Sequence, residues 1–70
     1  MTAVKIIKVL GTSSQSWDDA AEEAVAEASE TIEDIHGIKI VDRTADVEDG
    51  SITEYKVTVE ISFPVRHAQR

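Results

Sequence analysis

The chain contains no cysteine, so no disulfide can stabilise its 70 residues. This absence matters because a domain so short buries only about 60% of the surface that its unfolded chain exposes. Small scaffolds without disulfides depend on a metal ion, on unusually good packing or on oligomerisation. We therefore expect residues 1–70 to form a single domain with a thin core that is completed by self-association.

Long apolar runs and basic side chains are also scarce. No segment approaches the roughly 20 apolar residues of a membrane span, so no membrane partner is expected. The lack of a signal-peptide pattern suits a cytoplasmic protein. Seven Lys and Arg residues stand against 14 Asp and Glu residues, which gives a formal net charge of −7. The basic residues are scattered, whereas a nucleic-acid surface needs them clustered, so nucleic acid is not an expected partner.

Cations are the natural partners of such an acidic surface. The net charge can also have a simpler origin. It can serve general solubility, or it can be the acid-rich surface of a protein from a high-salt cell.

The sequence opens with a strand pattern and a helix pattern. Residues 3–10 are β-branched and aliphatic and stop at Gly11, which predicts a strand ending there. Apolar positions three and four residues apart follow from Trp17 and predict a helix of about 18 residues that ends near Gly37. Ser16 has capping-box spacing with an acid three residues later, although an earlier serine could cap the helix instead. The buried stripe of this helix is mostly alanine, so its backbone can lie close to a sheet.

Two further strands follow the helix. Residues 38–47 alternate imperfectly, Asp49-Gly50 is a hairpin signal, and the last strand alternates strictly until Pro64, where we expect pairing to end. The residues beyond Pro64 are expected to form a loose tail or a contact arm. The order predicts an α+β fold, β-α-β-β, with a three-stranded antiparallel sheet wrapped around one helix.

The expected lengths of the elements argue for assembly. A last strand of about 12 residues spans roughly 40 Å, whereas a helix of about 18 residues spans only some 27 Å. The hairpin should therefore overhang its own helix. Exposed strand edges are aggregation hazards unless they are covered, and symmetry-related copies are the obvious cover.

Several stretches of this sequence resemble the dodecin family, and the resemblance extends from about residue 4 to residue 65. The matching stretches are Gly11-Thr12-Ser13, Ala20-Ala21, Ala24 and Glu54-Tyr55-Lys56-Val57 through Phe63. The resemblance implies a hollow homododecamer built from trimers, in which each sheet wraps its helix and neighbouring sheets extend one another. It also implies a ligand-binding protein rather than an enzyme.

Most dodecins bind flavins such as FMN or riboflavin between a tryptophan after the helix and a glutamine on the last strand. The resemblance places these positions at Gly37 and Lys56. Glycine offers no ring for stacking, and an ammonium group donates hydrogen bonds but cannot accept them. The chain is more similar to the calcium dodecins, a branch without that tryptophan, including Ser16-Trp17 and the Asp34-Ile35 pair.

Our leading hypothesis is therefore a shell that binds or buffers small ligands, with divalent cations, calcium first, preferred over flavin. A flavin-storage dodecin with an altered pocket is one alternative. A structural, halophilic shell without a ligand is another.

Candidate metal ligands fall into two acidic groups. The first lies at the expected C-terminal end of the helix, where acids oppose the helix dipole, so a bound cation, lysines of a neighbouring subunit or salt should offset them. The second lies at the hairpin turn, where carboxylates could converge on a hard cation, although an ordinary solvated turn accounts for them too. The two groups are Glu30, Glu33 and Asp34, and Asp46, Glu48 and Asp49.

Catalytic chemistry has little support in this sequence. His36 and His67 are its only histidines, and no serine stands in a recognisable nucleophile setting. Trp17 most simply anchors the start of the helix on the sheet. Lys56 and Glu54 share the other face of the last strand, where we expect a salt bridge across a subunit contact. The sequence therefore favours a binding protein that is not an enzyme.

Overall fold

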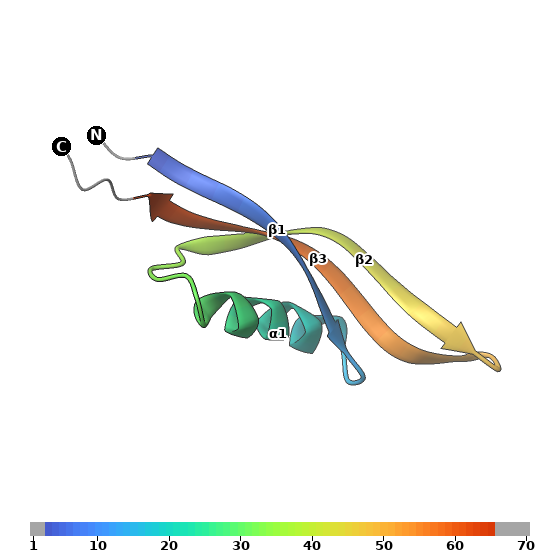
Figure 1. Cartoon of the computed structure of the whole chain (residues 1–70). Coiled ribbons are helices and arrows are strands. Elements are labelled where there is room, and N and C mark those ends of the chain that lie inside the picture. The colour runs from blue at the N-terminus through green and yellow to red at the C-terminus, as the bar shows by residue number, and fades with distance from the viewer. Residues whose placement is uncertain (1–2, 66–70) are drawn as a thin grey trace.

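The computed structural model describes residues 3–65 and contains, within them, one helix on one face of a three-stranded sheet (Figure 1). The elements are β1 (Ala3–Ser13), α1 (Trp17–Ser29), β2 (Gly37–Glu48) and β3 (Ser51–Val65). The sheet has the order β1-β3-β2, and both pairings are antiparallel. The predicted β-α-β-β architecture is thus confirmed.

The core lies between α1 and the inner face of β3. Val57, Val59 and Ile61 are fully buried, with 0% of their surface exposed. Their pairing partners on β1 are also glycine or aliphatic residues, which continue the apolar face across the sheet. The helix contributes only small side chains to this core, namely Ala20, Ala21, Ala24 and Ala28. The alternation predicted for the last strand and the alanine stripe predicted for the helix are both correct.

Gly11 lies inside β1, so the prediction that the strand ends there is wrong. A Cβ atom at this position would overlap the carbonyl oxygen of Ala20 and would lie 2.9 Å from the Cβ of Ala24. A glycine inside a strand often marks the close approach of another backbone. Here it lets α1 rest directly on β1, and the strand continues to Ser13.

The helix ends at Ser29, earlier than the predicted end near Gly37, and has 13 residues. The amides of Thr31 and Ile32 both donate to the carbonyl oxygen of Ala28, which closes the last turn. No basic residue lies in this turn, so nothing in it complements the helix dipole. Asp34 then adopts a φ of 61°, which turns the chain back towards β2.

The apolar spacing nevertheless continues beyond the helix. Ile32 and Ile35 are partly buried against the core although they belong to the connecting segment. Gly37 opens β2 rather than capping a helix. The spacing therefore identified residues that pack on the sheet, but not the backbone conformation that carries them.

β3 is longer than predicted because it runs through Pro64 to Val65. β2 begins opposite Ser62, so at Pro64 only β1 still pairs with β3. Proline is tolerated at such strand ends. The prediction that pairing stops at Pro64 is wrong, and so is the placement of Val65 in a tail. The rest of that predicted tail, residues 66–70, lies outside the described part of the chain.

Trp17 anchors the start of the helix on the sheet, as predicted. Its Nε1 donates a hydrogen bond to the carbonyl oxygen of Thr44 at 2.8 Å. Its ring meets that of Tyr55 edge to face, with the centroids 4.9 Å apart. Ser16 caps the helix by accepting a hydrogen bond from the amide of Asp19 at 2.9 Å. The predicted N-cap is confirmed.

The hairpin of β2 and β3 projects beyond this anchor, and the chain measures 58 × 19 × 13 Å (Figure 1). The predicted overhang is therefore present, and the shorter helix makes it larger. Among residues 3–65, no helix has the length and apolar character needed to cross a membrane.

Candidate functional site

The two acidic groups lie at opposite ends of the molecule (Figure 1). The first group follows the C-terminal end of α1, and the second surrounds the turn between β2 and β3. The N-terminus of α1, and not its C-terminus, points towards the turn between β2 and β3 (Figure 1). The two groups therefore do not form one site within a single chain.

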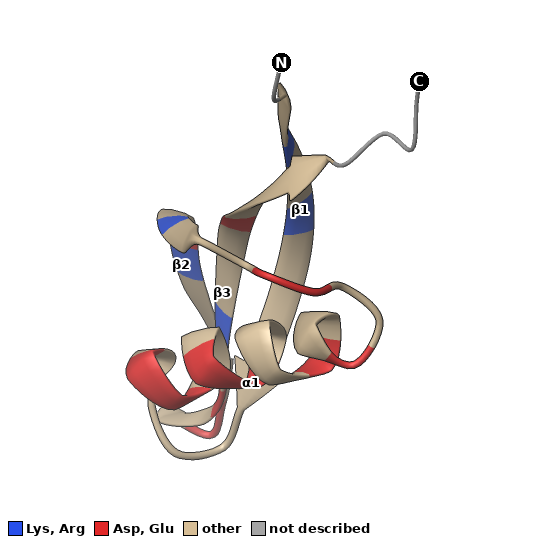
Figure 2. Cartoon of the chain, turned by 90° about the vertical axis from the view of Figure 1, so that its left-hand side faces the viewer, with Lys and Arg blue, Asp and Glu red and all other residues tan. Residues whose placement is uncertain are grey.

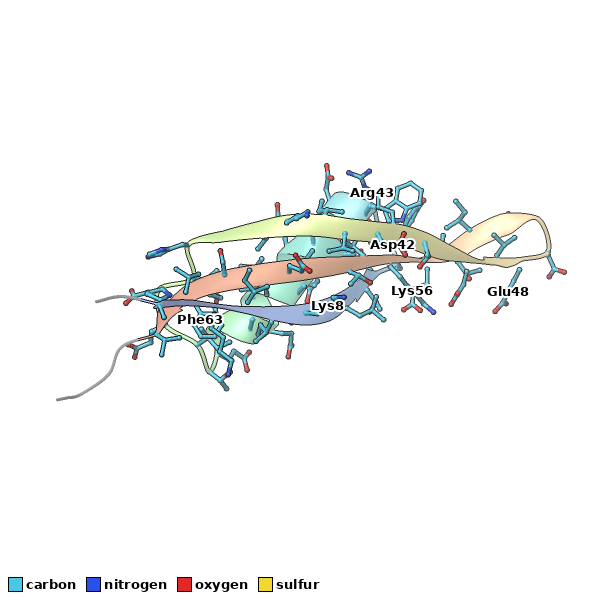
Figure 3. All side chains as sticks on the ribbon, turned by 90° about the horizontal axis from the view of Figure 1, so that it is seen from above. Lys8, Asp42, Arg43, Glu48, Lys56 and Phe63 are labelled. Carbon is cyan, nitrogen blue, oxygen red and sulfur yellow. The ribbon has the colours of Figure 1, made fainter. Side chains whose placement is uncertain are left out.

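The hairpin group is built around a tight turn. Asp49 and Gly50 have φ values of 50° and 78°, which is the left-handed pair typical of a two-residue hairpin loop. The predicted Asp-Gly turn is thus confirmed. Glu48 and Asp49 are exposed here, and Figure 3 shows Glu48 close to the end of the hairpin.

The third member of the hairpin group has a basic partner in the same chain. Oδ1 of Asp46 lies 3.2 Å from Nζ of Lys56. Lys56 thus has an acidic partner within its own chain, and the expected salt bridge across a subunit contact stays a prediction. Because both side chains are partly exposed, the pair stabilises the fold by less than about 1 kcal/mol.

The helix-end group lies beside a shallow hollow of about 420 Å³. Its lining includes Glu33 and Asp34 of the connecting segment, Lys5 of β1 and Phe63 of β3. A lysine of the same chain thus lines the same hollow as two of the acids, for which a bound cation, lysines of a neighbouring subunit or salt were the expected offsets. Glu30 caps the helix through its backbone amide, which bonds to the carbonyl oxygens of Glu27 and Ala28.

Figure 2 shows how unevenly the charges are distributed. The acidic residues concentrate on α1 and on the segment after it, and the basic residues lie on the strands. Within the helix, Asp18 and Asp19 occupy the first turn, where they complement the dipole. Ser13 donates a hydrogen bond to Oδ2 of Asp19 at 2.7 Å, which fixes one of these carboxylates.

A complete metal site is absent from the described part of one chain. Residues 3–65 contain no group of three or more His, Asp or Glu side chains placed to hold an ion. Calcium takes six to eight oxygen ligands. A calcium ion on this protein would therefore need backbone carbonyls, water or carboxylates of a second copy in addition to either acidic group.

The two positions implied for flavin contact are also far apart in one chain. Gly37 pairs with Ser62, whose hydroxyl donates to the Gly37 carbonyl oxygen at 3.2 Å. Lys56 lies six residues earlier on β3, which corresponds to roughly 20 Å along a strand. The residues present at these positions offer no ring to stack on and no accepting amide, so they do not fit the expected flavin contacts.

The fold leaves several apolar side chains uncovered that the sequence patterns did not identify. On β1 these are Val4, Ile6 and Leu10, which alternate with the buried face and point to the outer face of the sheet. On β2 and in the hairpin they are Ile38, Ile40, Val41, Val47 and Ile52. The aliphatic run of the first strand and the imperfect alternation of the second were the available signals, since a strand with one wet face alternates cleanly.

Comparison with known proteins decides the family. The family model of the dodecins matches residues 3–66. The chain belongs to the dodecin family. The calcium dodecin of Mycobacterium tuberculosis is 35% identical over 69 residues, which cover 99% of this chain and 97% of that protein.

Solved dodecin structures confirm the fold. The structure of the Mycobacterium tuberculosis calcium dodecin, described as calcium chelating and as having a novel calcium-binding site, superposes with a TM-score of 0.81 at 35% identity and covers 97% of both chains. The dodecin of Streptomyces coelicolor superposes with a TM-score of 0.92 at 24% identity and covers 96% of both chains. The sequence is thus nearer to the calcium dodecin, while the backbone follows the other dodecin more closely.

Proposed function

We propose that this dodecin is a homo-oligomeric shell that binds calcium and catalyses no reaction. The observation that carries the proposal is the similarity to the calcium dodecin, at 35% identity over nearly the whole of both chains. The other dodecin compared above is only 24% identical. A dodecamer built from trimers and a cytoplasmic location are parts of the same proposal.

The charge distribution supports a cationic ligand. α1 is rich in acidic side chains, and its last turn contains no basic residue. The whole chain has a net charge of −7. Repulsion among these carboxylates is reduced when a cation binds between them. Bringing copies together concentrates the negative charge further, so an assembled shell gains more from cations than a single chain does.

The candidate ligands remain the two acidic groups, and their geometry ranks them. Asp46 is already paired with Lys56, so Glu48 and Asp49 are the freer carboxylates of the hairpin group. Glu30 and Glu33 are exposed in the helix-end group. Because neither group completes a site in one chain, the proposal places calcium where carboxylates of two or more copies meet.

Isothermal titration with calcium chloride after chelator treatment tests the proposal. We expect saturable binding and a melting temperature that rises with calcium concentration, because a ligand that binds only the folded state stabilises it by mass action. Sodium chloride at matched ionic strength is the control for charge screening. Absence of binding heat, with no more stabilisation than sodium gives, would remove the calcium claim and leave a structural shell.

Paired carboxamide variants locate the site. Glu48→Gln with Asp49→Asn removes two charges at the hairpin with little change in shape, and Glu30→Gln with Glu33→Gln does the same at the helix end. We expect one pair to weaken calcium binding at least tenfold and the other to leave it within about threefold. If both pairs bind calcium like the parent protein, neither acidic group holds the ion.

Riboflavin and FMN provide a further control. Because Gly37 and Lys56 do not fit the expected ring contacts, we expect no quenching of flavin fluorescence on addition of the protein. Strong quenching at micromolar protein would favour a flavin-storage shell with an altered pocket.

A further inference from the structure

The turn between β2 and β3 is weakly held by its own chain. α1 packs on β1 and β3, and the turn projects beyond it (Figure 1). The pairing of β2 with β3 shifts register between Asp46 and Val47, so only the pairs Val47–Ile52 and Glu48–Ser51 lie between that irregularity and the turn. Short stretches of pairing at the end of an element open locally at a low free-energy cost. The turn can therefore open while the rest of the chain stays folded.

The backbone of the turn favours this opening. Asp49 has a φ of 50°, in the left-handed region that residues with a Cβ atom rarely occupy. Aspartate tolerates this region better than most residues, but less well than glycine does. Opening of the turn releases Asp49 from the strained conformation, which lowers the free-energy cost of opening.

The carboxylate of Asp49 and the amide that follows it are both free to react. The carboxylate is exposed and forms no hydrogen bond or ion pair with any residue in 3–65. Within the same range, the amide of Gly50 donates no hydrogen bond. Gly50 has no Cβ atom, and even an added Cβ would meet nothing within 4 Å. Nothing therefore hinders the approach of the Gly50 nitrogen to Cγ of Asp49.

We propose that Asp49 is a site of spontaneous covalent modification, at which the residue converts through a cyclic succinimide to isoaspartate. The Gly50 nitrogen attacks Cγ of the protonated Asp49 carboxyl group, the N–Cγ bond forms, and the carboxyl hydroxyl leaves as water with the amide proton. Water then opens the ring. Addition at Cγ restores aspartate, and addition at the backbone carbonyl carbon gives isoaspartate, whose main chain runs through Cγ.

The reaction needs no oxidant and no reactant other than water. It goes beyond the proposed function and does not depend on a bound ion.

The other aspartates lack this combination of features. Each of them is followed by a residue with a side chain, which crowds the attacking amide. Asp19 lies in α1 and accepts a hydrogen bond from the hydroxyl of Ser13. Asp46 is paired with Lys56. The structure thus distinguishes Asp49 from aspartates that the fold holds in place.

Asp42 is the most demanding internal comparison. Its Oδ1 accepts a hydrogen bond from the amide of Arg43 at 3.1 Å, so its carboxylate already lies near the following amide. Both residues, however, pair with β3, opposite Thr58 and Val57. This pairing holds the backbone extended, and the Arg43 side chain crowds the amide. Preference for Asp49 over Asp42 therefore separates the effect of an open turn and a glycine from proximity alone.

Isomerisation would change the turn itself. The main chain of isoaspartate is longer by one carbon atom, and its carboxylate is attached directly to Cα. A two-residue hairpin loop of this type needs left-handed dihedral angles at both residues. The longer main chain cannot close the loop in the same geometry, so the Glu48–Ser51 pair at its base is disrupted.

Ageing of the protein as purified tests the proposal. The protein is kept for several weeks at physiological temperature and mildly acidic pH, and the urea-unfolded chain is kept in parallel as a positive control. Trypsin cleavage after the lysines and arginines separates residues 40–43, with Asp42, from residues 44–56, with Asp49. Mass spectrometry with electron-transfer fragmentation then identifies isoaspartate by position. We expect at least about tenfold more at Asp49 than at Asp42, because only Asp49 precedes a glycine.

Two variants check the chemistry. Asp49→Glu keeps the charge but requires a larger ring, so an isoaspartyl methyltransferase should transfer far less labelled methyl group to the aged variant than to the aged parent. Asp49→Asn keeps the turn, since Asn-Gly is favoured in this type of hairpin loop. It forms the same ring with loss of ammonia instead of water, and it should convert faster than the parent.

The outcomes are distinct from those of the calcium titration. Isoaspartate at residue 49 of the native protein, at the expected excess over Asp42, supports the proposal. A native protein that stays unmodified at Asp49 while the unfolded chain converts overturns it, and so does equal conversion of Asp42 and Asp49. Because the product is covalent and is assigned by position, a protein that binds no calcium gives the same result, and failure of either proposal leaves the other standing.

Discussion

The two ends of the sheet differ in how much of their apolar surface the chain covers by itself. At one end α1 lies on β1 and β3, and three side chains of β3 are fully buried. At the other end the hairpin projects without a helix, and Val47 and Ile52 are exposed. The covered end can therefore specify the fold, while the bare end keeps apolar surface that its own chain does not bury.

The largest expected effect belongs to the covered end and concerns Gly11. Gly11→Ala should lower the free energy of unfolding by about 3 kcal/mol, because its Cβ meets the helix backbone at Ala20 and the side chain of Ala24. Chemical denaturation at fixed protein concentration measures this. Gly37→Ala is the matched control, since its Cβ would lie 3.7 Å from Oγ of Ser62, an ordinary contact.

A Gly11→Ala protein as stable as the parent would show that α1 does not rest on β1 as closely as described. An equal loss for Gly37→Ala would show that the effect is a general cost of replacing glycine in a strand.

Ile61 and Ile52 lie on the same strand, one at the covered end and one at the bare end, so their alanine variants compare the two ends directly. Ile61→Ala removes a fully buried side chain and should cost about 2–5 kcal/mol at any protein concentration. Ile52→Ala removes an exposed one and should alter the concentration dependence of assembly more than the stability of the folded chain. Denaturation and sedimentation over a hundredfold range of concentration measure both effects.

Equal and concentration-independent losses for Ile61→Ala and Ile52→Ala would contradict the division into a covered and a bare end. They would mean that something in the same chain buries the hairpin tip.

The smallest expected effect concerns the ion pair at the junction of the two ends. Lys56→Gln should change the free energy of unfolding by less than about 1 kcal/mol, because the Lys56–Asp46 pair is partly exposed. Lys8→Gln, an exposed lysine without an ion pair in the described range, is the control. Chemical denaturation at low and at high salt checks that the change is electrostatic in origin. A loss of unfolding free energy well above about 2 kcal/mol would mean that Lys56 contacts more than Asp46.

Most of the fold follows from local patterns in the sequence. The strict alternation of the last strand identified its buried face, and the Asp49-Gly50 turn and the Ser16 cap were recognised by their chemistry. These features depend on neighbouring residues, so they are visible without a structure. The alanine stripe also indicated correctly that the helix lies close to the sheet.

The errors arose where contacts distant in sequence decide the outcome. Gly11 looked like a strand end because glycine interrupts an aliphatic run, but its role is set by the approach of α1. Ile32 and Ile35 kept the helical spacing although they pack on the core from a connecting segment. Apolar spacing indicates which residues are buried, but it does not indicate which backbone conformation places them against the core.

The candidate site was predictable only in part, for the same reason. The sequence identifies which residues are acidic, and the turn explains why Glu48 and Asp49 are exposed. Whether carboxylates converge depends on how copies of the chain meet, and no pattern within one chain encodes that directly.

The most direct test of the account is native mass spectrometry of the unmodified protein, before and after chelation, at micromolar concentration. We expect a closed assembly at a multiple of 7.7 kDa that carries calcium, which chelation removes and added calcium restores. A stable, compact particle of 7.7 kDa without metal would contradict it.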